Sequence, residues 1–239
     1  MQTTHQLEVW GDFACFTRPE TKIERFSYPV MTPSAARGIL DAIYAKPAEF
    51  RWAVRTIEVL SPISYINLMR NEVKEKASVR AIQTAMNGAS DVLNPILADV
   101  TDPKNDRVGR TQRQTIALRD VRYRIHAEIR RWPGCKVSQQ ALDEQFLRRA
   151  MTGKCFAQPF LGCREFPAYF ALPSPERSLP PISVDMDLGW MLYDVYDLSR
   201  PAPVDARPRI SLFRASLRNG VMQIPDYDDP SVRKVDHEC

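Results

Sequence analysis

VRYRIHAEIR, residues 121–130, alternates apolar and polar side chains more regularly than any other stretch of this chain. The apolar members of the alternation are Val121, Tyr123, Ile125, Ala127 and Ile129. The polar members are Arg122, Arg124, His126, Glu128 and Arg130. Side chains of a β-strand point alternately to opposite faces, so a strict period of two indicates a strand that is buried on one face only. The segment therefore predicts a half-buried strand with a basic outer face.

Outward from this strand, the patterns on both sides predict a mixed helix and strand domain. Thr32 is a suitable N-cap and Pro33 a suitable first residue for a helix, and Ser138 and Gly153 are start and stop signals for a second one. Strands are expected at 5–13, 50–60, 61–73 and 155–172. The resulting order, β-α-β-β-α-β, predicts an α+β fold with a ferredoxin-like domain over residues 1–173, an arrangement that RNA-recognition domains also use.

Two segments stand apart from this pattern. Residues 71–110 combine mixed charge with Asn-Gly, Asn-Pro and Asp-Pro breaks, which predicts a partly mobile insertion with at most a short helix. The proline-rich residues 172–182 predict a linker. Beyond it, a strand at 184–198 and a hairpin with Asn219-Gly220 in a type I′ turn predict a small antiparallel all-β domain over residues 183–239.

The apolar face of the second helix is expected to form one stripe. Its members at helical spacing are Leu142, Phe146, Leu147, Ala150 and Met151.

Composition excludes several classes of protein. Of the 239 residues, 44% are hydrophobic and 26% charged, as in globular proteins, and no apolar run has the ~18 residues of a membrane span. The N-terminal residues lack the basic and apolar regions of a secretory signal, so we expect a cytoplasmic protein without membrane partners. The nine glycines form no dinucleotide or phosphate-binding loop. Five scattered cysteines and three histidines predict neither a disulfide framework nor a metal site, and no cofactor is expected.

Arginine supplies 25 of the 33 basic residues, which favours a nucleic-acid partner because its planar guanidinium binds phosphate in two-point contacts. Residues 107–131 hold eight arginines against two acids, Asp120 and Glu128. Like charges that alternate along a strand repel one another unless a polyanion offsets them, so this segment is expected to contact phosphates. The alternative is an ordinary solvated strand face.

Three residues could carry RNA-cleavage chemistry in which the ribose 2′-oxygen attacks the adjacent phosphate. His126 lies in the middle of the basic face, and an imidazole transfers protons near neutral pH. Tyr44 lies at the end of the first predicted helix, with Lys46 just beyond. The alternatives are an incidental surface histidine, a core tyrosine and a solvated lysine. Aromatic residues that could stack on bases, if exposed, are Phe13, Phe16, Phe26, Tyr28 and Trp52.

Five segments together resemble a known family. They are GDFACFTRPETKIERFSYPVMTPSAARGILDAIYAKP (11–47), NLMRNEV (67–73), RTQRQTIALRDVRYRIHAEI (110–129), CFAQPFLGCREFPAYF (155–170) and DLGWMLYDVYD (187–197). They are similar to the CRISPR-associated (Cas) family 5 proteins of subtype I-C (Dvulg), and FLGCREFPA and TPSAARGIL are specific. The resemblance implies a ferredoxin-like (RAMP) first domain and a small β-sheet second domain.

The resemblance also implies an activity. Members of this family cleave CRISPR repeat RNA (pre-crRNA) without metal. They then remain on the 5′ handle of the guide RNA (crRNA) beside the other Cas subunits of a type I-C effector complex, and duplex DNA is a further expected partner. Catalysis is ascribed there to a tyrosine that ends the first helix and to a Lys-His pair on a later strand. The tyrosine corresponds to Tyr44. For the pair we place His126 as the proton-transfer group, with Arg124 in place of the lysine, although the two are not adjacent here.

The sequence thus predicts a metal-independent endoribonuclease, with Tyr44, His126, Arg124 and Lys46 as catalytic residues. The products expected from 2′-hydroxyl attack carry a 2′,3′-cyclic phosphate. The alternative is an RNA- and DNA-binding scaffold subunit with weak or no cleavage. The residues expected to bind nucleic acid are Arg18, Lys22, Arg25, Arg37, Arg110, Arg113, Arg119, Arg122 and Arg130.

Overall fold

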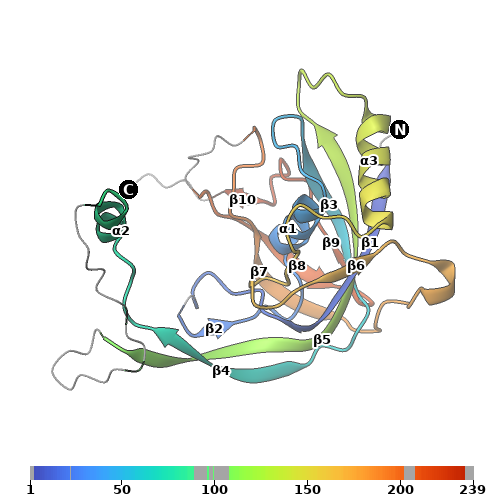
Figure 1. The fold of residues 1–239 in the computed structure, drawn as a ribbon. Helices are drawn as coiled ribbons and strands as arrows, with labels where there is room; N and C mark the ends of the chain where they lie inside the picture. Colours follow the sequence, from blue (N-terminus) through green and yellow to red (C-terminus); the bar gives the residue numbers. More distant parts are fainter. Residues whose placement is uncertain are drawn as a thin grey trace. The chain divides into compact units, whose positions relative to one another are not determined.

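A computed structural model of the chain describes residues 3–21, 23–88, 96, 99, 108–201 and 208–234. Its internal contacts divide the chain into two compact units, one formed by Met1–Ile66 with Ile116–Cys239 and the other by Asn67–Thr115. Figure 1 follows the chain through its helices and strands in sequence colours. The strand β5 (Arg110–Arg131) belongs partly to each unit.

In the first unit the main sheet follows the spatial order β6-β1-β5-β3-β9. The strands are β1 (Thr4–Ala14), β3 (Phe50–Val59), β6 (Tyr169–Ala171) and β9 (Val221–Gln223) around β5, and the short β2 (Arg25–Phe26) also pairs with β5. The pairs of β5 with β1 and β3, of β1 with β6 and of β3 with β9 are all antiparallel. The predicted strands at 5–13, 50–60 and 121–130 are confirmed, and the last of them is the central strand.

Two helices lie on one face of this sheet. In α1 (Pro33–Ile43) the Thr32 Oγ1 accepts a hydrogen bond from the Ala35 N–H at 3.2 Å, which confirms the predicted N-cap. In α3 (Gln139–Met151) the Ser138 Oγ caps Ala141 in the same way. Leu142, Phe146 and Ala150 of α3 are buried. The rest of the predicted stripe is wrong, because Leu147 and Met151 face solvent at 37% and 74% exposure.

The register of β5 defines the two faces of the sheet. Trp52 of β3 pairs with Ile129, and the Trp52 ring lies 4.7 Å from the ring of Phe146 on α3, so the odd-numbered residues of β5 from Val121 onward face the helices. On β5 these residues are buried from Val121 to Ile129. The even-numbered residues face the opposite side, as the alternation predicts, and we call this side the outer face.

A second, three-stranded sheet follows the order β10-β8-β7. Its strands are β7 (Met186–Asp194), β8 (Ser211–Leu217) and β10 (Arg233–Lys234). Asn219 and Gly220 have φ angles of 49° and 72°, and Arg218 and Val221 form a bridge across them, which confirms the predicted two-residue turn. After this turn β9 joins the main sheet beside β3.

The second unit contains most of β4 (Tyr65–Val73), α2 (Val79–Met86) and the first part of β5. The Lys74 N–H donates to the Gly109 carbonyl at 2.9 Å, next to the pairing of β4 with β5. The prediction of at most a short helix within residues 71–110 is confirmed by the eight residues of α2. The remainder of that prediction falls largely on residues 89–107, most of which lie outside the described residues.

The predicted strand at 155–172 is largely wrong, since only Tyr169–Ala171 form a strand. Pro159 and Pro167 supply no backbone N–H for a ladder, and Gly162 adopts a φ of 83°, so the segment folds as an irregular loop.

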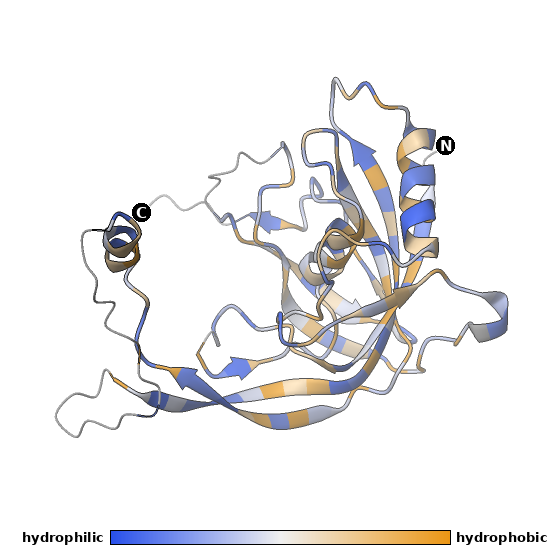
Figure 2. Cartoon of the chain, viewed as in Figure 1, coloured by the Kyte–Doolittle hydropathy of each residue, from blue (hydrophilic) through white to orange (hydrophobic). Residues whose placement is uncertain are grey.

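The predicted linker at 172–182 contains a 3-10 turn, η1 (Pro175–Arg177). None of the helices in the described part of the chain is long and apolar enough to cross a membrane. Figure 2 places the apolar residues mainly on the strands and helices of the first unit.

Candidate functional site

Tyr44 terminates α1 on the helix-covered side of the main sheet. Its N–H donates to the Leu40 carbonyl at 2.8 Å, and its own carbonyl accepts the indole N–H of Trp52 at 2.9 Å. The phenol ring lies 5.2 Å from the ring of Phe50, and the residue is only 3% exposed. The structure therefore places Tyr44 in a fixed, nearly buried position just below the surface at the end of α1.

The pKa values of Tyr44 and Lys46 decide which of these two side chains can give or accept a proton near neutral pH. Burial raises the pKa of Tyr44, and the nearby Lys46 lowers it only in part. The Lys46 ammonium is exposed and donates to the Glu49 carboxylate at 3.2 Å, and this hydrogen bond raises its pKa. Near neutral pH the phenol is thus uncharged and the ammonium is charged. Tyr44 can donate a hydrogen bond and Lys46 can neutralise a phosphate, but neither is a base.

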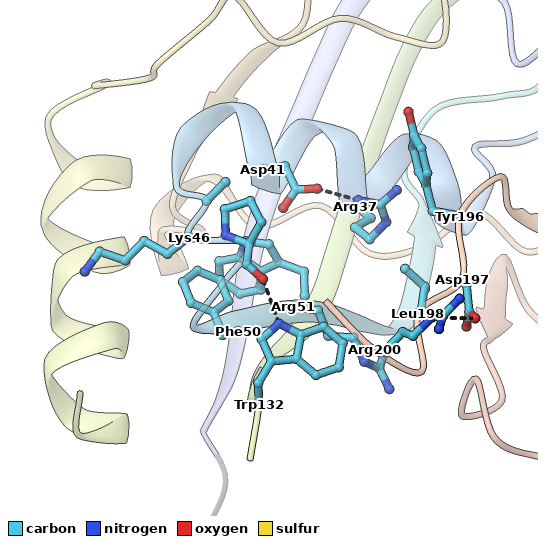
Figure 3. Close-up of a pocket in the computed structure, with 13 residues that line it drawn as sticks. Arg37, Asp41, Lys46, Phe50, Arg51, Trp132, Tyr196, Asp197, Leu198 and Arg200 are labelled. Atoms are coloured by element: carbon cyan, nitrogen blue, oxygen red, sulfur yellow. Dashed lines mark hydrogen bonds and ion pairs between the residues drawn. The ribbon is translucent and has the colours of Figure 1, made fainter. Parts of the chain in front are cut away.

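A cavity of about 290 Å³ opens next to Lys46. Its lining residues, most of which are labelled in Figure 3, are Arg37, Asp41, Ala45, Lys46, Pro47, Phe50, Arg51, Trp52, Trp132, Tyr196, Asp197, Leu198 and Arg200. The Trp132 indole N–H donates to the Pro47 carbonyl at 2.8 Å, and this hydrogen bond holds the indole ring as one wall of the cavity. The Lys46 ammonium points away from the cavity. Cations and aromatic rings in one hollow are the surroundings that nucleotides prefer.

His126 and Arg124 lie on the outer face. The His126 Nε2 is 2.8 Å from Glu58 Oε1 on β3, and the Arg124 guanidinium donates to Glu58 Oε2 at 2.6 Å and to Glu8 Oε1 on β1 at 2.8 Å. Arg124 also donates to the Leu179 carbonyl and is 7% exposed. Hydrogen bonds from Arg122 and Arg124 overcome the effect of burial and lower the pKa of Glu8. The group has the character of a buried ion-pair network.

The structure does not bring the four predicted catalytic residues together. Phe50, which packs on Tyr44, pairs with the odd-numbered Arg131, whereas His126 and Arg124 have even numbers and face the other way. Tyr44 and Lys46 are neighbours at the end of α1, and His126 and Arg124 are neighbours on the opposite face. The catalytic assignment of His126 and Arg124 stays a prediction.

Three arginines on the outer face of β5, Arg122, Arg124 and Arg130, are paired with carboxylates of the protein itself. Arg122 donates to Glu8 at 2.7 Å and Arg130 to Asp226 at 2.6 Å. The repulsion between these like charges is therefore offset within the protein, and contact of this face with phosphates stays a prediction. The carboxylates come from the neighbouring strand β1 and from the loop after β9, so their approach to β5 is set by the tertiary fold.

The other residues predicted to bind nucleic acid have varied surroundings. Arg37 connects α1 to β7 through Asp194 at 2.6 Å and also pairs with Asp41 of the same helix at 2.5 Å; burial would lower its pKa, but the two carboxylates raise it overall. Arg25 donates to Glu165 at 2.5 Å, and Arg119 donates to Ser64 at 3.0 Å.

Arg18 lies 4.8 Å from the ring centre of Tyr28. In the second unit Arg110 is exposed and 3.4 Å from Asp99, and Arg113 is half-buried. Lys22 lies outside the described residues, as do His237 and Cys239.

Three of the aromatics considered for base stacking are in the core. Phe16, Tyr28 and Trp52 are 2%, 2% and 1% exposed, whereas Phe13 and Phe26 are half-buried. Sequence reasoning missed Arg51 and Trp132, which line the cavity. A signal for Trp132 is its place directly after the central strand. A signal for Arg51 is its alternation with Phe50 and Trp52 at the start of β3. Among the described residues no group of three or more histidine, cysteine or acidic side chains could hold a metal ion.

Comparison with known proteins identifies the family. A family model described as CRISPR-associated protein (Cas_Cas5), Cas_Cas5d, matches residues 5–225. A CRISPR pre-crRNA endoribonuclease Cas5d from Mannheimia succiniciproducens is 42% identical over 236 residues, which cover 96% of this chain and 98% of that protein. A protein of the same name from Thermus thermophilus is 38% identical over 232 residues, which cover 92% and 90%.

A solved structure entitled crystal structure of a CRISPR-associated protein matches with a TM-score of 0.62 and 20% identity, over 97% of both chains. This likeness concerns the fold, and it agrees with the α+β architecture built on antiparallel sheets. Because the family model spans residues 5–225 and two relatives match nearly the whole chain at 42% and 38% identity, this chain belongs to the Cas5d family of CRISPR-associated proteins.

Proposed function

We propose that this chain is a pre-crRNA endoribonuclease that cleaves CRISPR repeat RNA without a metal ion. The observation that carries the proposal is the match, over more than nine-tenths of the chain, to two relatives that bear this name. The proposal includes a second role, in which the protein stays on the 5′ handle of the guide RNA as a subunit of a type I-C interference complex in the cytosol. Duplex DNA is a further proposed ligand of that complex.

We infer that the first domain, residues 1–173, is ferredoxin-like. The four strands that alternate with the helices in β-α-β-β-α-β order are β1, β3, β5 and β6, and they lie in the spatial order β6-β1-β5-β3. All of their pairings are antiparallel, and both helices lie on one face. The separate β7, β8 and β10 sheet supports a small second domain over residues 183–239, although β9 joins the main sheet.

The proposed chemistry is attack of the ribose 2′-oxygen on the neighbouring phosphorus. The 2′-hydroxyl proton passes to a base, the bond to the 5′-oxygen breaks, and that oxygen takes up a proton. The products are a 2′,3′-cyclic phosphate and a 5′-hydroxyl. At the end of α1, the neutral Tyr44 phenol can donate a hydrogen bond to a phosphate or leaving oxygen, and the Lys46 ammonium can stabilise the charge that develops on the phosphate.

A second candidate is the binding subunit without strong cleavage, and one observation favours it. Tyr44 is nearly buried, and His126, the only imidazole among the predicted catalytic residues, is bonded to Glu58 on the opposite face of the sheet. An RNA phosphate therefore meets the phenol and the imidazole in separate places. In this case the arginines govern RNA affinity, and substitution of Tyr44 leaves the function unchanged.

One assay separates the two candidates. The purified protein is incubated in EDTA with an end-labelled repeat hairpin and, as a control, with a hairpin of the same composition and scrambled sequence. Cleavage of the repeat hairpin alone, at one position and with a 2′,3′-cyclic phosphate end, supports the endoribonuclease. Salt-sensitive binding of the repeat without product supports the binding subunit.

A further inference from the structure

Arg51 is a nearly buried guanidinium that lacks a hydrogen bond. Its side chain is 10% exposed and lines the cavity at the end of α1. Among the described residues it donates to none, and its ion contact, to Asp226 Oδ1, is 3.9 Å long. The other oxygen of that carboxylate already accepts from Arg55 at 3.1 Å and from Arg130 at 2.6 Å. Arg51 is thus the third cation beside one carboxylate.

The charge of Arg51, which has only the long ion contact to Asp226, is costly where it lies. Burial lowers the pKa of Arg51, and the acidic groups nearby offset this only in part. Buried charged groups are usually paired and hydrogen-bonded, because desolvation is otherwise uncompensated. Arg37 in the same cavity obeys the rule, with hydrogen bonds to Asp194 and Asp41. The difference between the two arginines indicates that an anion completes the surroundings of Arg51.

The carboxylates that line the cavity do not oppose such an anion. Asp41 is bonded to Arg37 at 2.5 Å, as the dashed line in Figure 3 marks. Asp197 lies 3.4 Å from Arg209 and 3.7 Å from Arg200; against the effect of burial, hydrogen bonds from Ser199 and then these two cations lower its pKa. Both acids are therefore paired with arginines, and Arg51 is a nearly buried cation of the lining with no hydrogen bond among the described residues.

The walls of the cavity suit an aromatic base. The indole of Trp132 is fixed by its hydrogen bond to Pro47, and the Arg51 guanidinium carbon lies 6.0 Å from the indole ring. Tyr196, which is 43% exposed, forms another part of the lining. The volume of about 290 Å³ is just below the ~300–1,000 Å³ found for small-molecule pockets. It therefore accommodates one nucleotide and not a duplex.

We propose that this cavity binds a single unstacked nucleotide of the RNA, with a phosphate oxygen on the Arg51 guanidinium and the base stacked on Trp132. The identity of the occupant as RNA rests on the proposed function, whereas the chemistry of the site requires only a phosphate joined to an aromatic base. The site binds and positions the strand and has no part in the bond-breaking step.

The first experiment measures the binding of adenosine 5′-monophosphate, adenosine and inorganic phosphate by calorimetric titration. The monophosphate is expected to bind at least tenfold more tightly than either part alone. Arg51→Gln should weaken monophosphate binding about tenfold or more, as expected for a lost charged hydrogen bond. Trp132→Ala should weaken the monophosphate by a similar factor and leave phosphate binding within about twofold, because stacking contributes ~1–3 kcal/mol per base.

Two further variants keep the test decisive. Arg214→Gln removes one surface arginine that does not line the cavity, and should bind the monophosphate like the unaltered protein. Arg51→Lys retains a cation and should give an intermediate affinity, which a folding defect would not produce. Two outcomes would overturn the proposal. One is equal monophosphate binding by the unaltered protein and Arg51→Gln. The other is no binding by the unaltered protein at 10 mM monophosphate, roughly the weakest affinity of interest.

The second experiment identifies the source of the nucleotide. If RNA supplies it, Arg51→Gln weakens repeat-hairpin binding about tenfold at fixed salt, and the monophosphate competes with the hairpin. Unchanged hairpin binding with no competition would overturn the RNA occupant. Failure of the proposed function gives a different result. If the protein does not cleave RNA but binds the monophosphate through Arg51, the endoribonuclease activity is contradicted and the nucleotide site still stands.

Discussion

His126 Nε2 lies 2.8 Å from Glu58 Oε1, on the face of the main sheet opposite the one on which Tyr44 packs. The Glu58 carboxylate is shared, since its other oxygen accepts from Arg124. A histidine and a tyrosine expected to act on one phosphate are thus held by different parts of the fold. The end of α1, with Tyr44, Lys46 and the adjacent cavity, is the region where a phosphate, a cation and an aromatic wall can meet.

Arg124→Ala is expected to destabilise the protein. The side chain links β1 and β3 through Glu8 and Glu58, and its removal leaves Oε1 of the 4% exposed Glu8 carboxylate without the hydrogen bond from Arg124, while Oε2 keeps its bond from Arg122. Loss of one member of a buried ion pair lowers the free energy of unfolding by about 3–5 kcal/mol. Urea denaturation measures the change. Arg214→Ala, at a surface pair, serves as the control with a change within about 0.5 kcal/mol; an equally small effect of Arg124→Ala would contradict the structural role.

Gly162→Ala should also destabilise the protein, while Gly38→Ala should not. Gly162 has a φ of 83°, and a Cβ there would lie 2.1 Å from the Cys15 carbonyl oxygen. The left-handed conformation alone disfavours an alanine by about 1–2 kcal/mol, and the clash adds to this. Gly38 is inside α1 with nothing within 4 Å of a Cβ, so alanine there should raise stability by about 0.5–1 kcal/mol. Thermal unfolding of both variants measures the two effects, and shifts of the same sign in the two unfolding temperatures would refute this prediction.

Alkylation of Cys163 should follow a titration near neutral pH. A hydrogen bond with the Cys15 thiol, the largest cause, lowers the pKa of Cys163 to about 7, with help from the Arg25 guanidinium 3.3 Å from its sulfur and against the effect of burial. The reactive thiolate is therefore populated above pH 7 and lost below it. The rate of iodoacetamide labelling at Cys163, followed by mass spectrometry, should be half-maximal near pH 7.

Arg25→Gln should move that midpoint upward, because the cation that favours the thiolate is gone. Cys15 serves as the internal control: its hydrogen bond with Cys163 and its burial raise its pKa, so it should label slowly throughout. A Cys163 midpoint near that of an ordinary cysteine, about 8.5, would contradict the thiol pairing.

The sequence allowed the fold to be predicted where local signals were strong. The alternation of residues 121–130, the caps Thr32 and Ser138 and the Asn219-Gly220 turn each determine a local conformation, and each is found in the structure. The strand predicted at residues 155–172 is largely wrong because their aromatic composition resembles that of a strand, while the prolines prevent a ladder of backbone hydrogen bonds. Local patterns also do not reveal which strands become neighbours.

The candidate site depends on those neighbours. The pairing of Arg122 and Arg124 with Glu8 joins residues more than a hundred positions apart, so the sequence of β5 alone does not reveal these partners. His5, which no local sequence pattern distinguishes, is buried and bonded to Asp143 on α3 at 2.7 Å. Tyr44 could be placed at the end of α1, but its burial follows from contacts with Phe50 that no spacing reveals.

Single-turnover cleavage of the repeat hairpin in EDTA by Tyr44→Phe and His126→Ala tests the central claim most directly. If the chemistry lies at the end of α1, Tyr44→Phe lowers the cleavage rate by about a hundredfold or more, as the loss of a proton-donating group in the transition state does. His126→Ala, on the opposite face, then retains the rate to within a few-fold once the folded fraction is matched. Loss of cleavage in His126→Ala together with full activity in Tyr44→Phe would contradict the account.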